Sequence, residues 1–388
     1  MLLLIIGCGG GGTSSPTPAA TTDPNRMLFS EALAQITDSS FSDCMERDSA
    51  TYADQVKLIA CTSSGIASID GIENFTSVET LYLQSNSLNS IDLSGNTELR
   101  TVDLSFNLLT TLDLSQNTKL TKLIVNANDF LSDLNLSQNT ELTVLTLIQS
   151  DSLINLDISN NTKLTELDLR YSYQLENLDL SNNTELVKAN LRGDTLDFSH
   201  NTKLQWLNAT VDSQSSIDFG NNTELTELSI RGPNLSTVGL INNTKLVTLF
   251  ISLTSSFGKV NEVDLSNNIA LTYLSIFHSN LSTLDVRNNT KLVNLRLFQN
   301  FLTSIDVSNN TELVELDLTS NDLTSIDVSN NTKLVDLSLR SSRLTSVPLG
   351  LSNISSTNAR IDLTVNNFNE NAKEELRVLK LTYPNLSY

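Results

Sequence analysis

The apolar residues of this chain recur in one pattern from residue 65 to residue 366. One unit carries the pattern in full at Leu99, Val102, Leu104, Asn107, Leu109, Leu112 and Leu114. Its centre alternates apolar and polar residues, which predicts a short strand with Val102 and Leu104 pointing inward and Asp103 outward. A single unit cannot bury all of its apolar residues alone, so the pattern predicts a stack of coils.

An Asn, usually followed by Thr, marks each unit. It occurs at Asn74, Asn96, Asn117, Asn139, Asn161, Asn183, Asn201, Asn222, Asn243, Asn268, Asn289, Asn310, Asn331 and Asn353. Most units are 21 or 22 residues long, and the exceptions are an interval of 18 before Asn201 and one of 25 before Asn268. We therefore expect about 14 coils, of which one is shortened and one carries an insertion.

The second residue after the Asn residues from Asn96 to Asn331 gives an independent check on the register. The position holds Glu98, Lys119, Glu141, Lys163, Glu185, Lys203, Glu224, Lys245, Ala270, Lys291, Glu312 and Lys333. The sign of the charge alternates along the whole stack and is missing only at Ala270. Because coils lie about 5 Å apart, we expect nearly every Glu to have a Lys on both sides, at about 0.2–1 kcal/mol per exposed pair.

The repeat resembles the leucine-rich repeat, whose pattern is LxxLxLxxNxL. The resemblance covers residues 65–366 and implies an α/β solenoid: an arc of stacked coils with a parallel β-sheet on its concave face and helical caps. In this family the turn Asn, here Asn107, bonds backbone groups of neighbouring coils. In the middle of the chain it is replaced by Ser150, Ser172, Asp194, Asp212, Pro233, Thr254 and Ser279. We expect a weaker ladder and less regular coils there.

Both ends of the repeat region need caps that keep the terminal Leu rows out of water. We assign residues 27–64 to an N-terminal cap that begins with an amphipathic helix from Met27 to Ile36. We assign residues 367–388 to a C-terminal cap, in which a helix over 372–381 covers a last strand at 361–363.

The N-terminal segment combines an apolar run, a Cys and a Gly-, Ser-, Thr- and Pro-rich stretch. Ile5-Ile6-Gly7-Cys8 resembles the lipobox of bacterial lipoproteins, which implies that residues 1–8 are a signal, that Cys8 is lipidated and that residues 9–26 are a flexible tether. The alternative is an ordinary leader in which Cys8 has no role. The apolar run is shorter than in most such signals, and no Lys or Arg precedes it; a start codon assigned too far downstream would explain both departures. Gly9 after Cys8 favours the outer membrane in a Gram-negative cell.

If Cys8 carries lipid, Cys44 and Cys61 remain as a pair, and an exported compartment permits a disulfide between them. Such a bridge closes a small loop and stabilises the chain by about 3 kcal/mol in the chain-entropy estimate. Two reduced, buried thiols are the alternative.

Charge and motifs exclude several functions. Asp and Glu outnumber Lys and Arg by 44 to 24, so the net charge of −20 disfavours nucleic acid and anionic lipid headgroups as ligands. The chain has two histidines, His200 and His278, and it lacks GxSxG, GxxxxGK, HExxH and CxxC motifs. We expect no enzyme activity.

Large rings stand out among the outward-facing strand positions, most of which are small or polar. The candidate ligand-binding residues are Trp206, Phe250, Tyr273, Phe277 and Phe298, with Arg231, Arg296 and His278 beside them. Trp, Tyr and Arg dominate binding hot spots, so the cluster predicts a binding surface. The alternative is that insertion residues such as Phe257 fold over the rings and bury them.

Two charged rows allow both a structural and a binding interpretation. Arg170, Arg192 and Arg231 either pair with Glu166, Asp168 and Glu227 or bind an acidic protein segment or a uronate-type sugar. A row of Asp residues on the opposite wall occupies Asp92, Asp113, Asp157, Asp179, Asp197, Asp218, Asp264, Asp285, Asp306 and Asp327. The repulsion in this row is offset either by backbone N–H groups of the adjoining turn or by weakly bound Ca²⁺. No other cofactor is expected.

Bacterial leucine-rich-repeat surface proteins of this kind, the internalins among them, are adhesins and protein-binding modules. The resemblance implies a monomeric cell-envelope protein, attached to the membrane only by its lipid, that binds a protein ligand through the concave face. A glycan-binding accessory lipoprotein and a structural envelope protein are the alternatives.

Overall fold

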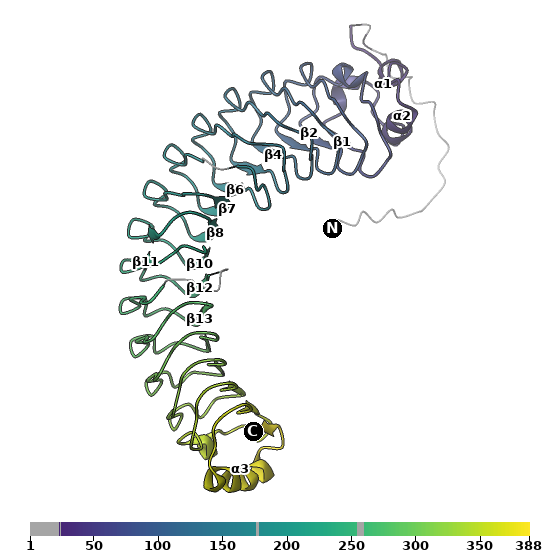
Figure 1. The fold of residues 1–388 in the computed structure, drawn as a ribbon. Helices are drawn as coiled ribbons and strands as arrows, with labels where there is room; N and C mark the ends of the chain where they lie inside the picture. The colour runs from purple at the N-terminus through teal and green to yellow at the C-terminus, as the bar shows by residue number, and fades with distance from the viewer. Residues whose placement is uncertain (1–22, 24, 176–177, 254–259) are drawn as a thin grey trace, which may run out of the picture.

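The computed structural model describes residues 23, 25–175, 178–253 and 260–388. The chain winds into an arch of stacked coils, with the main sheet along the inner side and short helices at both ends (Figure 1). The predicted leucine-rich-repeat solenoid with a concave parallel sheet is confirmed.

Within the described residues the main sheet has 16 strands in chain order, and every neighbouring pair is parallel. Its three-residue strands are β1 (Leu58–Ala60), β2 (Thr80–Tyr82), β3 (Thr101–Asp103), β4 (Lys122–Ile124), β5 (Val144–Thr146), β6 (Glu166–Asp168), β14 (Asn294–Arg296), β15 (Glu315–Asp317), β16 (Asp336–Ser338) and β17 (Arg360–Asp362). Its longer strands are β7 (Lys188–Gly193), β8 (Trp206–Val211), β10 (Glu227–Arg231), β12 (Thr248–Ser252) and β13 (Tyr273–Phe277). A separate two-stranded sheet joins β9 (Ser216–Asp218) to β11 (Thr237–Gly239) on the convex side (Figure 1).

The repeated Asn residues form a buried ladder through the stack. Those from Asn96 to Asn331 donate from Nδ2 to two carbonyls of the preceding coil, as Asn310 does to Val286 at 3.0 Å and to Asn289 at 2.9 Å. The same pair of bonds occurs at Asn96, Asn117, Asn139, Asn161, Asn183, Asn201, Asn222, Asn243, Asn268, Asn289 and Asn331. These side chains are completely buried, so the spacing that defines the repeat is also what joins one coil to the next. Asn74 and Asn353, which the sequence placed in the same series, lie outside the ladder: Asn74 donates to Gln35 and Gly71, and Asn353 donates to the Ser329 carbonyl and is exposed.

The turn Asn forms a second ladder in the outer coils. Asn107 donates to the carbonyls of Leu83 and Leu104, both at 3.0 Å, and accepts from the backbone N–H of Leu88 at 3.1 Å. The residue before it, Phe106, is left-handed with φ 56°. This turn ends the outer strands after three residues.

The central coils depart from the turn geometry of the outer coils, as the replaced Asn residues predicted, but their strands are longer. In the described part of the chain, Gly193, Val211, Gly232 and Leu253 precede the replaced turn positions without the left-handed backbone of the outer coils. The backbone there stays extended, so β7, β8, β10 and β12 have five or six residues and pair over that length. At Ser172 the hydroxyl replaces the amide and donates to the Leu147 carbonyl at 2.6 Å.

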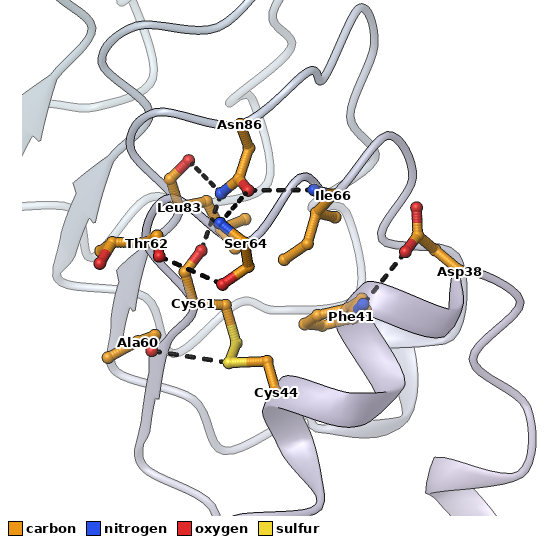
Figure 2. The surroundings of a disulfide bond; sticks show 10 residues. All are labelled: Asp38, Phe41, Cys44, Ala60, Cys61, Thr62, Ser64, Ile66, Leu83 and Asn86. Carbon is orange, nitrogen blue, oxygen red and sulfur yellow. Dashed lines mark hydrogen bonds between the residues drawn. A yellow bond between two sulfur atoms is a disulfide. The ribbon is translucent and has the colours of Figure 1, made fainter.

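The N-terminal cap is held to the first coil by a disulfide. It contains α1 (Phe29–Leu33), α2 (Ser39–Met45) and a 3-10 turn at Ala53–Gln55, so the predicted first helix is present but shorter. Cys44, on α2, is bonded to Cys61, after β1, with the two Cα atoms 5.8 Å apart (Figure 2). The predicted disulfide is confirmed, and the alternative of two reduced thiols is wrong. A second 3-10 turn, Ile72–Asn74, follows.

The C-terminal cap helix is α3 (Glu370–Thr382), two residues longer at its start than predicted. A 3-10 turn at Leu351–Asn353 precedes β17. After α3 the Tyr383 hydroxyl donates to the Ile354 carbonyl at 2.8 Å, and the chain adds β18 (Leu386–Ser387) beside β17. The predicted strand at 361–363 is therefore present at Arg360–Asp362, but it is not the last strand. The sequence did not predict β18, because a strand of two residues shows no alternating pattern.

Candidate binding surface on the concave face

The five aromatic residues singled out in the sequence all point outward from the inner sheet. We call Trp206, Phe250, Tyr273, Phe277 and Phe298 the aromatic surface; they lie on β8, β12 and β13 and just after β14. All five side chains are half-buried, and the inward neighbours of each strand fill the core. Large rings here have no core to pack into, so they cover one another and the sheet.

Three of these rings form a stack at the turn side of the face. Phe277 lies parallel to Phe298, with ring centroids 4.5 Å apart, and meets Phe250 edge to face at 5.0 Å. The exposed His278 ring lies against Phe277 at 5.2 Å. The structure thus brings Phe250, Phe277, Phe298 and His278 together as the sequence predicted.

The remaining rings, Trp206 and Tyr273, together with Phe250 surround a shallow pocket of about 320 Å³, which we call the concave pocket. Trp206 lines it from β8, and Phe250 and Tyr273 line it from β12 and β13. Its remaining polar lining is Asn208, Glu227, Ser229, Arg231 and Thr248. The small side chain of Ser229 leaves the hollow open between larger neighbours. A pocket with aromatic walls and several hydrogen-bonding groups suits a side chain or sugar ring better than a flat contact.

A cation lies over each wall of the pocket. Lys188 Nζ is 5.5 Å from the centroid of the Trp206 ring, and the Arg231 guanidinium is 4.9 Å from that of Phe250. The Arg296 guanidinium is 5.6 Å from the Tyr273 ring centroid and also binds Glu315, which raises the pKa of Arg296 and lowers that of Glu315. These contacts fix the orientation of the rings.

The predicted pairing of the Arg row is only partly present. Arg170 binds Asp168 at 3.0 Å, as predicted. Arg192 instead binds Asp212 in the next coil, at 2.8 Å. Arg231 donates to Asn208 Oδ1 at 2.6 Å and forms no ion pair with Glu227 within the described residues. Glu227 lies four residues away along the same strand, so it stands too far off to reach Arg231.

The Asp row finds its hydrogen-bond partners locally. Asp306 Oδ1 accepts from the backbone N–H of Ser308 at 3.0 Å, and the other nine residues accept in the same way from the second residue after them. The Ser308 hydroxyl and backbone N–H lower the pKa of Asp306, and the Arg287 side chain lowers the pKa of Asp285 to about 2. These bonds supply the offset that the repulsion requires; Ca²⁺ binding stays a prediction.

The Glu and Lys row pairs off in twos. Lys119 Nζ lies 2.6 Å from Glu98 Oε1, and the same bond joins Lys163 to Glu141. Lys203, Lys245 and Lys333 likewise bind the Glu of the preceding coil. Nowhere in the described ranges does one of these Lys residues also pair with the Glu that follows, so the continuous ladder predicted from the sequence is wrong. The Lys119 ammonium group donates to both carboxylate oxygens of Glu98, so it points toward that coil and away from the Glu of the next coil.

Sequence reasoning missed a band of exposed apolar side chains beside the turns of four successive coils. The band consists of Phe106, Leu108, Phe130, Ile154, Tyr171 and Tyr173, each about half exposed or more. The available signal was an additional apolar residue close to a turn position: Phe106, Leu108, Tyr171 and Tyr173 flank one directly, and Phe130 and Ile154 follow one by two and four residues.

Several sequence predictions fall on residues outside the described ranges. The predicted signal with its lipidation site Cys8 and most of the predicted tether lie in the N-terminal segment, and Phe257, the candidate cover of the rings, lies in the insertion. None of the helices in the described ranges is long and apolar enough to cross a bilayer. His200 lies with Nδ1 3.1 Å from the Ser199 hydroxyl and far along the stack from His278.

Comparison with solved structures places the fold among bacterial leucine-rich-repeat proteins. The functional domain of InlJ from Listeria monocytogenes is 28% identical over 82% of this chain and 77% of that one, with a TM-score of 0.65. A leucine-rich-repeat protein from Leptospira interrogans is 20% identical over 86% and 96%, with a TM-score of 0.62. The internalin InlF from L. monocytogenes is 21% identical over 89% and 98%, with a TM-score of 0.60.

The chain is thus an internalin-like leucine-rich-repeat protein. No protein-family model and no curated protein sequence matches it. The InlJ domain is described as including a cysteine ladder, whereas the repeating ladders of this chain are built from Asn.

Proposed function

We propose that the chain is a non-catalytic cell-envelope protein that binds a protein ligand through the concave face, at the aromatic surface. The observation that carries the proposal is the half-exposed set of rings around the concave pocket, on a sheet whose other outward positions are mostly small or polar. Burying such rings against a partner releases about 25 cal/mol per Å² of apolar area, which makes them the natural anchors of an interface.

Other leucine-rich-repeat chains of this fold support a protein partner without identifying it. Toll, 21% identical to this chain, was solved in complex with Spätzle. The fold alone does not decide the ligand, since TLR13, 18% identical, was solved with a single-stranded RNA. The net charge of −20 disfavours nucleic acid for the present chain.

Capture from host or envelope extract tests the proposal. The triple substitution Trp206→Ala, Phe250→Ala and Phe298→Ala removes rings from both parts of the aromatic surface and should abolish the captured signal. Phe130→Ala and Phe301→Ala are matched controls, because both rings are more than half exposed and lie outside that surface. Unchanged circular dichroism and melting temperature show that the variant is folded. Capture that survives the triple substitution places the binding site elsewhere.

A glycan is the second candidate ligand, because Asn208, Ser229 and Thr248 place hydrogen-bonding groups among the rings of the concave pocket. A glycan array with the same variants separates the two. Signal on the array that the triple substitution removes, with no protein captured, favours the glycan-binding alternative. A structural envelope protein would give neither signal.

We also propose that Cys8 anchors the chain to the membrane as a lipoprotein. Cys8→Ser should abolish incorporation of labelled fatty acid and release the protein from the membrane fraction of cells that express the full chain. Incorporation that persists in Cys8→Ser contradicts the anchor. Surface accessibility to added protease then distinguishes exposure on the cell from an inward-facing anchor.

A further inference from the structure

The concave pocket contains two charges that the protein leaves without an opposite partner. Arg231 and Glu227 both lie on β10 and both line the pocket. Neither takes part in an ion pair within the part of the chain that the structure describes. The neighbouring charges of this face are neutralised by Lys188–Glu166, Arg192–Asp212 and Arg296–Glu315 contacts at 2.5–2.9 Å. The two charges of the pocket are therefore unpaired among the described residues, whereas these neighbours are paired.

The arrangement on β10 spaces the two charges. Residues 227, 229 and 231 point outward because side chains alternate along a strand, and four residues of strand span about 13 Å. Ser229, between them, lies beside Phe250 on one neighbouring strand and Asn208 on the other. The Glu227 carboxylate thus lies at one end of the apolar hollow, and the Arg231 guanidinium comes from the other end and leans back over the Phe250 ring.

Arg231 is held in place but is not saturated. Its Nη1 donates to Asn208 Oδ1, and its guanidinium lies over the Phe250 ring. A guanidinium has five N–H donors, and Asn208 accepts one of them. The remaining donors can bind a carboxylate in the two-point geometry that arginine favours. Glu227 is exposed and offers both oxygens to a cation.

We infer that the concave pocket recognises an extended peptide segment with an acidic and a basic side chain on either side of an apolar one. This inference rests on the proposed protein-binding function. The acidic side chain binds Arg231, the basic one binds Glu227, and the apolar one enters the hollow lined by Trp206, Phe250 and Tyr273. A uronate sugar satisfies Arg231 but leaves Glu227 facing an anion, which favours the peptide.

Trp206 provides the measurement, because it is the only tryptophan of the chain and lines the pocket. Its fluorescence is titrated with capped nonapeptides that carry Asp-Gly-Phe-Gly-Lys between glycines. The comparison peptides replace both charges by Asp, both by Lys, or the Phe by Gly. We expect the peptide with one charge of each sign to bind at least tenfold more tightly than any of the three others.

Charge substitutions then test each end of the pocket. Arg231→Gln should weaken binding of the mixed-charge peptide about tenfold. Arg231→Glu should shift the preference to the peptide with two Lys, and Glu227→Lys should shift it to the one with two Asp. Arg340→Gln is the matched control: Arg340 is an exposed arginine that follows another strand of the main sheet, contacts only a hydroxyl, and lies outside the pocket. It should leave all affinities unchanged.

The inference and the proposed function fail in different ways. Equal binding of all four peptides, no fluorescence change at millimolar peptide, or unchanged preferences in Arg231→Glu overturns the mixed-charge peptide. So does a glucuronate-containing oligosaccharide whose binding depends on Arg231 but not on Glu227. Protein capture that the triple alanine substitution abolishes still supports the proposed function in each of these cases.

Discussion

The outer and central coils of the arch are joined to their neighbours by different sets of hydrogen bonds. In the outer coils a left-handed residue ends each strand after three residues, and in several of them the side chain of the Asn that follows joins neighbouring coils. In the coils of β7, β8, β10 and β12 the backbone stays extended, and strands of five or six residues join the coils through backbone hydrogen bonds. Two rings of the aromatic surface, Trp206 and Phe250, lie on these longer strands, and two more lie on β13, which has five residues although the left-handed His278 follows it.

The largest expected effect is from removing a turn Asn in an outer coil. Asn107→Ala leaves the carbonyls of Leu83 and Leu104 and the N–H of Leu88 buried without a partner, which should lower the free energy of unfolding by roughly 3–4 kcal/mol. Asp194→Ala, at the same position of a central coil, should change it by less than about 0.5 kcal/mol. Urea unfolding followed by circular dichroism measures both. Similar losses in the two variants would show that both kinds of coil depend on the turn side chain.

The disulfide secures the first coil of the outer ladder. The Asn86 amide donates to the Cys61 carbonyl at 2.7 Å, so the ladder begins on the segment that the disulfide holds (Figure 2). Cys44→Ser with Cys61→Ser should lower the free energy of unfolding by about 3 kcal/mol, because the unfolded chain gains the freedom of a 17-residue loop. Limited proteolysis should then cut the N-terminal coils before the central ones. Simultaneous cutting of both regions would contradict the comparison.

Substitution of the residue before the turn should have different effects on stability in a central coil and in an outer coil. A Cβ on Gly232 would lie 2.8 Å from the Val211 carbonyl oxygen, so Gly232→Ala in the centre should destabilise by about 1–3 kcal/mol. Ser320 occupies the equivalent position of an outer coil with φ 57°. Ser320→Gly relieves left-handed strain but adds freedom to the unfolded chain, so its effect should stay within about 0.5 kcal/mol. Thermal unfolding of both proteins checks the pair.

The smallest effect is expected from Ca²⁺, because the Asp row has the same local bonds in both kinds of coil. Ser266 and Ser308 N–H groups already bind Asp264 and Asp306 at 2.9 and 3.0 Å. We expect the melting temperature to change by less than about 1 °C between millimolar Ca²⁺ and chelator. A rise of several degrees with Ca²⁺ would show that the row binds the metal.

The fold could be predicted from the sequence because the same pattern of apolar and Asn positions recurs in successive coils. Leu104 and Asn310, for example, occupy positions that hold the same type of residue in most coils. What could not be predicted depended on single coils. The long central strands depend on backbone angles at Gly193 and Gly232 that no repeat predicts, and β18 is too short to carry a pattern.

The candidate site was predictable in its residues but not in its contacts. Large rings at outward positions are visible in the sequence, so all five members of the aromatic surface were found. Side-chain partners depend on rotamers rather than on spacing, so the contacts of Arg231 with Asn208 and of Arg192 with Asp212 were missed. The division of the rings into a stack and a pocket follows from the same contacts.

The paired Glu and Lys residues have a consequence for how the arch changes in length. Each pair is complete within two adjacent coils, such as Glu312 with Lys333. Insertion or loss of two coils at a time preserves every pair, whereas a change of one coil sets two residues of like charge side by side. Gene duplication is therefore expected to lengthen the arch by two coils at a time. Each such step extends the concave surface that faces a ligand by about 10 Å.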